Sequence, residues 1–303
     1  MKFGCFLQTL FEDGPICSVE LPRAGLGNKL LIWARAYLFA QRNDLPIISR
    51  GWCHLHVGPI LRGERNRFYW RYFRRPRNFV ALIVRRQLSK RKVFDPSPEI
   101  TIDKQNYIGT TFVFRKLPHF SDYFADLRDH RGQLMAVIHA MLRRRYAAQL
   151  ASLAPPIIGL HVRRGDFKII GATTPIDYFT AVIEGVRHLL QRTIPVTVFS
   201  DAPDEELAPL LALPVIARSQ PAADIVDLLL LSRSKVLICS AGSTFSYWAA
   251  FLSEASVIGP PDASLGKIRP DSLKSCWFEG TVDIRNYDQW PPLLVRNLKE
   301  ALS

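Results

Sequence analysis

The chain has 303 residues, which is enough for two domains of ordinary size. Its composition, 48% hydrophobic and 22% charged, is that of a folded globular chain and excludes intrinsic disorder. Lysine and arginine number 40 against 27 acidic residues, and this formal net charge of +13 indicates an anionic partner or substrate.

The first half of the chain predicts a β-loop-α-β unit. A short apolar strand is expected at 19–21, and the sequence G-L-G-N at 25–28 predicts a tight turn. A helix rich in Leu, Trp, Ala, Tyr and Phe follows at 29–42, with a second strand at 46–49. Further along, 112–114 predicts another strand and 134–150 a single long helix.

The positive charge belongs to this first half. Residues 1–150 hold 26 basic and 11 acidic side chains, whereas residues 151–303 hold 14 and 16. Within it, the segment 62–92 has 12 basic residues and one acid, Glu64, and five aromatic residues are interleaved with the basic ones at 68–73. Such a segment suits an anionic surface of nucleic acid, lipid or acidic glycan. It equally suits a solvated basic face whose aromatic rings belong to the local core, and both interpretations stay open.

The second half predicts a parallel sheet covered by helices on both faces. Short β-branched or apolar strands are expected at 156–162, 194–200, 213–217, 236–239 and 256–259. Helices are expected between them, at 176–191, from about 204, at 224–232 and at 244–252. Thr174 with Pro175 is expected to open the first of these helices, and Asp201 with Pro203 the second. Alternation of this kind is typical of α/β domains. We place the domain boundary after residue 152, so that the domains are 1–152 and 153–303.

Cysteine usage favours a reducing compartment. The five cysteines are scattered and form no C-x-x-C pair, which argues against a disulfide framework or a zinc site. The amino terminus meets Glu12 and Asp13 before any long apolar run, unlike a secretory signal, and the longest uncharged run, 236–253, is too polar to span a membrane. We therefore expect a cytoplasmic protein.

Four short motifs lie at predicted strand ends or helix starts. The first, H-V-R-R-G-D at 161–166, puts His161 and Arg163 on one side of a strand end, where a guanidinium can bind two phosphate oxygens. A surface arginine pair bonded to Asp166 is the structural alternative. The second, S-A-G-S-T-F-S at 240–246, places small residues at a helix start, which suits either a diphosphate or an ordinary cap.

The other two motifs are weaker alone. G-L-G-N at 25–28 is a second possible phosphate turn, and F-S-D at 199–201 could place Asp201 on a base or ribose, although an N-cap is the simpler interpretation of that aspartate. In an α/β architecture, ligands bind beyond the carboxyl ends of the strands, where the following helices begin. We therefore expect one cleft between the domains to bring the four motifs together.

Taken in order and spacing, these motifs together with S-T-F-S-Y-W-A-A-F-L at 243–252 resemble the bacterial α1,2-fucosyltransferase family and its α1,6- and protein O-fucosyltransferase relatives. The resemblance implies an α/β fold of the GT-B type, with two Rossmann-like domains whose parallel sheets face a cleft. It also implies inverting, metal-independent transfer of L-fucose from GDP-fucose to a glycan hydroxyl, with an α1,2 linkage, as in bacterial polysaccharides such as O-antigen. No separate cofactor is implied.

The resemblance also implies roles for particular residues. Arg163 would hold the β-phosphate and His161 would contact the nucleotide, with Asp201 near the nucleoside. The diphosphate would bind at the start of a helix, to Ser243, Thr244, Phe245 and Ser246. The first domain would contact the phosphate or fucose through Gly25, Gly27 and Asn28. Independently of the resemblance, Asp166 is a candidate general base because it adjoins the phosphate-binding arginine, and an orienting ion pair with Arg164 is the alternative.

Two departures concern the acceptor. Lys29 stands where relatives usually have glutamine, and Tyr247 stands where a tryptophan is common. The sequence has no D-x-D triplet, so we expect no metal site. Alternatives are another nucleotide-linked deoxysugar as donor, or a non-catalytic polyanion-binding protein; nucleic acid is not the expected partner. For the basic segment we expect contact with an acidic or lipid-diphosphate-linked glycan, peripherally at an anionic membrane face.

Overall fold

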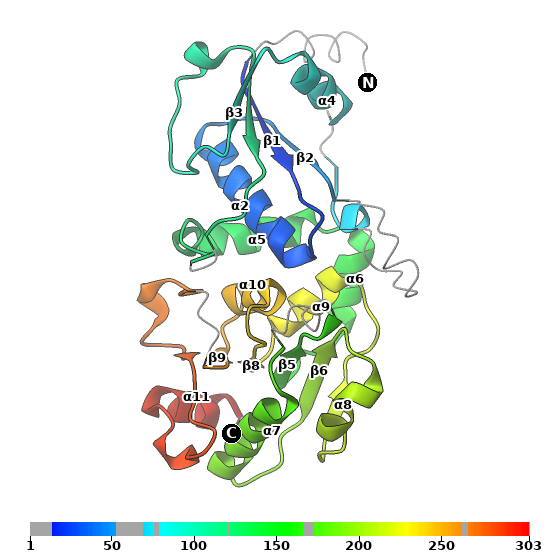
Figure 1. Ribbon diagram of the computed structural model, residues 1–303, viewed down its shortest axis with the longest axis vertical. Helices are drawn as coiled ribbons and strands as arrows, with labels where there is room; N and C mark the ends of the chain where they lie inside the picture. Colours follow the sequence, from blue (N-terminus) through cyan, green and yellow to red (C-terminus); the bar gives the residue numbers. More distant parts are fainter. Residues whose placement is uncertain are drawn as a thin grey trace. The chain divides into compact units, whose positions relative to one another are not determined.

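The computed structural model describes residues 14–52, 69–75, 79–119, 122–165, 173–261 and 266–302. The chain divides into two compact units, Met1–Arg143 and Arg144–Ser303. Each unit is an α/β domain built on one parallel sheet, as the sequence predicts (Figure 1).

The first unit has a four-stranded parallel sheet in the order β2-β1-β4-β3. Its strands are β1 (Ile16–Glu20), β2 (Ile47–Arg50), β3 (Arg91–Phe94) and β4 (Thr110–Phe114). Its helical elements are α2 (Leu26–Arg42), η1 (Tyr69–Arg71), α4 (Phe79–Leu88), η2 (Lys104–Tyr107), η3 (Arg128–His130) and α5 (Arg131–Met141). Strand β3 and helix α4 had no counterpart among the predicted elements.

Helices α2 and α4 cover opposite faces of this sheet. Successive residues of β1 point to opposite faces. Cys17 faces α2, since its thiol lies 3.5 Å from the carbonyl of Ala36, while Ile16 packs with Leu82 of α4. The sheet is therefore sandwiched, and both helices bury apolar side chains against it.

Helix α2 begins earlier than the sequence predicts. Gly25 is its N-cap, and the Lys29 N–H donates to the Gly25 carbonyl at 3.2 Å, closing the first helical turn. Gly27 and Asn28 are consequently helical residues, and the prediction of a separate tight turn at 25–28 was wrong.

The predicted single helix at 134–150 is two helices, α5 and α6 (Arg144–Ser152). Leu142 forms an antiparallel bridge with Phe73, and the Arg143 N–H donates to the Tyr72 carbonyl at 2.9 Å. These tertiary hydrogen bonds replace helical ones and end α5. The two units divide at this break, so α6 belongs to the second unit rather than preceding a boundary after residue 152.

The second unit has a six-stranded sheet whose paired strands all run parallel, in the order β10-β9-β8-β5-β6-β7. Its strands are β5 (Ile158–Val162), β6 (Val196–Ser200), β7 (Ile216–Arg218), β8 (Val236–Ile238), β9 (Ser256–Ile258) and β10 (Glu279–Gly280). Its remaining helices are α7 (Ile176–Leu190), α8 (Asp204–Leu211), α9 (Asp224–Leu231), α10 (Thr244–Leu252), η5 (Asp271–Leu273), η6 (Tyr287–Gln289) and α11 (Pro292–Leu302).

The two faces of β5 pack differently. Ile158, Leu160 and Val162 point into a buried cluster with residues of α7 and α11. Gly159 points the other way, toward Leu231 at the end of α9, where an added Cβ would overlap its neighbours. The close approach of α9 therefore needs glycine at this position. By alternation, His161 lies on the same side as Gly159.

Candidate active site

The carboxyl edge of the second unit's sheet carries most of the predicted site residues. Strands β8, β5 and β6 are neighbours in the sheet and run parallel, so their carboxyl ends lie at one edge. Arg163 directly follows β5, Asp201 directly follows β6, and Ser243 lies between β8 and α10. The sheet order thus gathers three of the sequence motifs at one edge of one domain.

Arg163 and Asp201 form an ion pair across this edge. Nη1 of Arg163 lies 2.7 Å from Oδ2 of Asp201, and the two side chains are 20% and 26% exposed. The other carboxylate oxygen, Oδ1, accepts the N–H of Arg164 at 2.9 Å. One carboxylate therefore holds both the guanidinium and the backbone that follows β5.

Asp201 is therefore not the N-cap of the following helix, which was the simpler interpretation of this residue from the sequence. The N-cap of α8 is Pro203, and the carboxylate turns toward β5 instead. The hydroxyl of Ser200 supports this turn, because it donates to the Val162 carbonyl at 2.7 Å and accepts the Ala202 N–H at 3.0 Å.

Gly165 lies directly beside the Asp201 carboxylate. A Cβ added at Gly165 would overlap Oδ2 of Asp201, so the absence of a side chain lets the carboxylate approach the backbone. Asp166, the expected general base, lies outside the described residues, and that role stays a prediction.

Ser240 joins β8 to the arginine segment, a role that the sequence reasoning missed. Its hydroxyl donates to the His161 carbonyl at 2.8 Å and accepts the Arg163 N–H at 2.9 Å. These two hydrogen bonds extend the pairing of β5 with β8 beyond the end of β8. The place where Arg163 leaves the sheet is therefore held from β8 as well as from β6.

The segment before α10 is shaped by two further hydroxyl groups. Thr174 Oγ1 accepts the Ala241 N–H at 2.9 Å, and the Tyr247 hydroxyl accepts the Gly242 N–H at 3.3 Å. Gly242 has φ of +63°, a left-handed conformation that favours glycine. The expected capping of α7 by Thr174 was wrong, because Pro175 is its N-cap and Thr174 bonds this segment instead.

Ser243 is the N-cap of α10, but its side chain makes no capping hydrogen bond. The first N–H groups of a helix have no intrahelical acceptor, so those of Thr244, Phe245 and Ser246 suit an anion. The hydroxyl of Ser246 is fully buried and donates to the Ser243 carbonyl at 3.1 Å. The Ser246 side chain, which the resemblance assigns to the diphosphate, therefore also stabilises the first turn of α10.

His161 is buried and stacks on Phe245, with ring centroids 5.0 Å apart and an interplanar angle of 24°. Burial, and secondarily the Arg163 charge, lowers the pKa of His161 to about 3. The ring is therefore neutral near pH 7, and its Nδ1 has no hydrogen-bond partner among the described residues. A neutral ring suits a neutral nucleotide surface better than a phosphate.

Asp227 is a half-buried acid that no motif identified. Burial, with a smaller contribution from Asp224, raises its pKa to about 7, and Oδ1 has no hydrogen-bond partner among the described residues. Asp227 lies one turn before Leu231 on α9, and Leu231 packs beneath Gly159 on the His161 side of β5. Asp227 can be recognised as a candidate functional residue only from the raised pKa that burial in the folded domain causes.

The three predicted residues of the first unit are at the start of α2. Gly25 has no atom within 4 Å of an added Cβ, apart from its chain neighbours. The side-chain oxygen of Asn28 is buried and has no hydrogen-bond partner in the described part of the chain. The expected contact of Gly25, Gly27 and Asn28 with phosphate or fucose stays a prediction.

Comparison with known protein families gives one match. A family model described as Glycosyl transferase family 11 matches residues 91–259, which is more than half of the chain. None of the curated proteins compared matches the chain.

Solved structures with a similar fold include fucosyltransferase NodZ from Bradyrhizobium. That structure has a TM-score of 0.50 at 16% identity, covering 79% of this chain and 94% of that one. The structure of NodZ α1,6-fucosyltransferase co-crystallised with GDP has a TM-score of 0.51 at 17% identity, and the match covers 79% of this chain and 93% of that one. At such identities the similarity shows the fold, and the predicted α/β fold of the GT-B type is confirmed.

Proposed function

Because the chain belongs to glycosyl transferase family 11, we propose that it transfers L-fucose from GDP-fucose to a glycan hydroxyl, with inversion and an α1,2 linkage. The motifs that resemble fucosyltransferases support the donor, and so do the similar folds of fucosyltransferase NodZ and of NodZ α1,6-fucosyltransferase with GDP. The linkage rests on the resemblance of the motifs to the α1,2 family.

The observation that carries this proposal is the position of Arg163. As the bond between fucose C1 and the β-phosphate oxygen breaks, that oxygen takes up the bonding electron pair and GDP leaves. A guanidinium already held at the edge of the sheet lowers the energy of this charge without moving during the reaction. Asp201 is proposed as a positioning residue that holds Arg163 through their ion pair.

The remaining roles follow the geometry of the same edge. The N–H groups at the start of α10 would bind diphosphate oxygens, and His161 with Phe245 would contact the nucleoside. The acceptor oxygen would attack C1 from the face opposite GDP and lose its proton to a carboxylate, for which Asp166 is our proposal. Because guanidinium and N–H groups supply the charge stabilisation, we propose that no metal ion is required.

A donor screen tests the proposal. Thermal unfolding with GDP-fucose, GDP-mannose and UDP-sugars should show the largest stabilisation with GDP-fucose. A larger shift with GDP-mannose or a UDP-sugar would assign that donor instead. Transfer measured in excess EDTA should keep its rate, whereas restoration by Mg²⁺ after loss would contradict a metal-free reaction. NMR of the product then establishes linkage and anomeric configuration.

A further inference from the structure

The outer face of α4 is apolar. On its inner side, Ala81 and Leu82 are buried against the sheet. On the outer side, Val80 is 61% and Leu88 is 70% exposed, and half-buried Val84 lies between them at a spacing of four residues. Residues at this spacing share one helix face. The helix therefore presents an apolar stripe where a surface helix normally has polar side chains.

The chain around this stripe is basic and contains no acid. Residues 69–75 and 79–92 hold eight lysines and arginines and no aspartate or glutamate. Two of them serve the fold, since Arg86 is buried and pairs with Glu20, and Arg85 donates to the Gly14 carbonyl. Lys90 and Lys92 follow the stripe, are exposed, and have no carboxylate partner among the described residues.

Arg75 connects α4 to a second basic and aromatic feature, Trp70. Its guanidinium carbon lies 5.3 Å from the ring centroid of Phe79 and 5.7 Å from that of Trp70. Arg71 and Arg143 also lie over the half-buried Trp70 ring, at 5.2 and 5.8 Å. An indole ring surrounded by guanidinium groups is suited to the boundary between apolar and polar surroundings.

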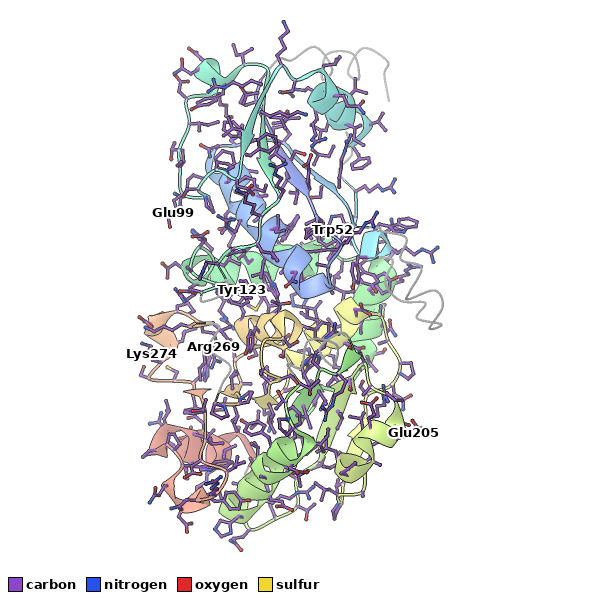
Figure 2. All side chains as sticks on the ribbon, viewed as in Figure 1. Trp52, Glu99, Tyr123, Glu205, Arg269 and Lys274 are labelled. Carbon is purple, nitrogen blue, oxygen red and sulfur yellow. The ribbon has the colours of Figure 1, made fainter. Side chains whose placement is uncertain are left out.

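The base of this feature is rigid. Nε of Arg74 donates to the Leu142 carbonyl at 3.0 Å, and Nε of Arg143 donates to the Phe73 carbonyl at 3.1 Å. Phe73 in turn packs against Trp52, with ring centroids 4.9 Å apart. Trp52 is labelled in Figure 2. These contacts hold the guanidinium groups of Arg74 and Arg143 in place, and among the described residues the terminal nitrogens of these two groups make no hydrogen bond.

We propose that this surface binds an anionic lipid bilayer. We call it the α4 surface, and it comprises Trp70, Arg75, Val80, Val84, Leu88, Lys90 and Lys92. A bilayer offers phosphate groups to the cations and acyl chains to the apolar stripe, whereas nucleic acid offers no aliphatic layer for Val80 and Leu88. In the described part of the chain, no helix is long and apolar enough to cross a membrane. The contact that we propose is a peripheral one. The proposal goes beyond the transfer reaction, because it concerns where the chain is held.

Cosedimentation of the full chain with vesicles tests the proposal. Binding is measured to phosphatidylcholine vesicles with and without phosphatidylglycerol. Lys90→Gln with Lys92→Gln should lower binding to the anionic vesicles about thirtyfold at low salt, since each basic residue near the surface contributes on the order of 1 kcal/mol. Val80→Gln with Leu88→Gln should lower it about tenfold, and high salt should not abolish this difference.

The matched control is Arg285→Gln with Lys299→Gln in the second unit, which removes the same charge from exposed positions. Equal binding by this control and by the Lys90 and Lys92 variant would overturn the proposal, as would equal binding of the native chain to both vesicle types. Strand β3 is a sheet edge, and edge lysines also prevent association. Aggregation of the Lys90 and Lys92 variant with unchanged lipid binding would assign them that role instead.

A second copy of the chain is the remaining occupant. If light scattering shows a native dimer that Val80→Gln with Leu88→Gln converts to a monomer, while no form binds vesicles, the surface is a protein interface. The GDP-fucose shift in thermal unfolding should be the same in all these variants, because none lies in the second unit's candidate site. Failure of membrane binding is therefore distinguishable from failure of the proposed fucosyl transfer.

Discussion

Asp201 holds Arg163 from the neighbouring strand, with Oδ2 2.7 Å from Nη1, while its other oxygen accepts the Arg164 N–H. The two residues lie 38 positions apart in the chain and meet only because β6 pairs with β5. The guanidinium is thus oriented by the protein alone. Orientation before the ligand arrives reduces the reorganisation that the reaction requires.

Arg163→Lys should lower kcat by about 10²- to 10³-fold and leave the folded state intact. A lysine ammonium is a compact charge and cannot bind a carboxylate and a phosphate with a planar fork. Steady-state kinetics with GDP-fucose and thermal unfolding measure the two effects. Near-native kcat in a folded Arg163→Lys protein would remove Arg163 from the mechanism.

The role of Asp201 is tested by the double variant. If Asp201 acts only by positioning Arg163, then Asp201→Asn should lower kcat on its own but should add little to Arg163→Lys. Losses that multiply would show that Asp201 contributes independently, as a direct nucleoside contact would.

Gly165→Ala should impair turnover more than stability. The new Cβ would overlap Oδ2 of Asp201, which can swing aside and so disturb Arg163 at little cost to the fold. We expect kcat to fall about tenfold with a change in unfolding free energy below about 1 kcal/mol. Gly132→Ala is the control, because its Cβ would meet nothing within 4 Å and its helix α5 tolerates alanine. A native kcat in Gly165→Ala would contradict the positioning role.

Much of the second unit could be predicted because its signals are local. Short β-branched runs gave four of the five strands close to the predicted bounds, while β7 begins three residues later than predicted. Helix α10 has the predicted bounds of 244 and 252. The single helix at 134–150 failed for a tertiary reason: hydrogen bonds from residues near Phe73, far away in sequence, end α5. Local propensity contains no information about such a partner.

The candidate site shows the same division. Its motifs were visible as strand ends and helix starts, so Arg163 and the start of α10 could be placed at one edge. The pairing of Asp201 with Arg163, and the hydroxyl contacts of Ser240 and Thr174, depend on which strands are neighbours. Asp227 belongs to no sequence motif, because the property that distinguishes it, a raised pKa, is caused by burial in the folded domain.

His161 should make the protein less stable in acid. Its folded-state pKa is about 3 against an ordinary value of 6.5, so between these pH values the unfolded chain binds a proton that the folded chain does not. Stability should therefore fall as pH decreases from 6.5 toward 3, by about 2 kcal/mol at pH 5 from this residue. His161→Phe keeps a ring against Phe245 and should remove this loss.

Urea unfolding of both proteins at pH 7 and pH 5 measures the difference. If native and His161→Phe proteins lost equal stability between the two pH values, His161 would not be a buried neutral ring.

Asp227→Asn should stabilise the protein in alkali. The raised pKa of Asp227, about 7, means that the folded chain binds a proton between pH 4 and pH 7 that the unfolded chain has lost, so this group's contribution to stability falls as pH rises. Asparagine removes the buried charge and should raise the unfolding free energy at pH 8 by on the order of 2 kcal/mol, with little change at pH 4. The exposed Asp129→Asn is the control and should leave the unfolding free energy at pH 8 nearly native. An unfolding free energy of Asp227→Asn at pH 8 equal to that of the native protein would show that the Asp227 carboxyl is not held in a buried, neutral form.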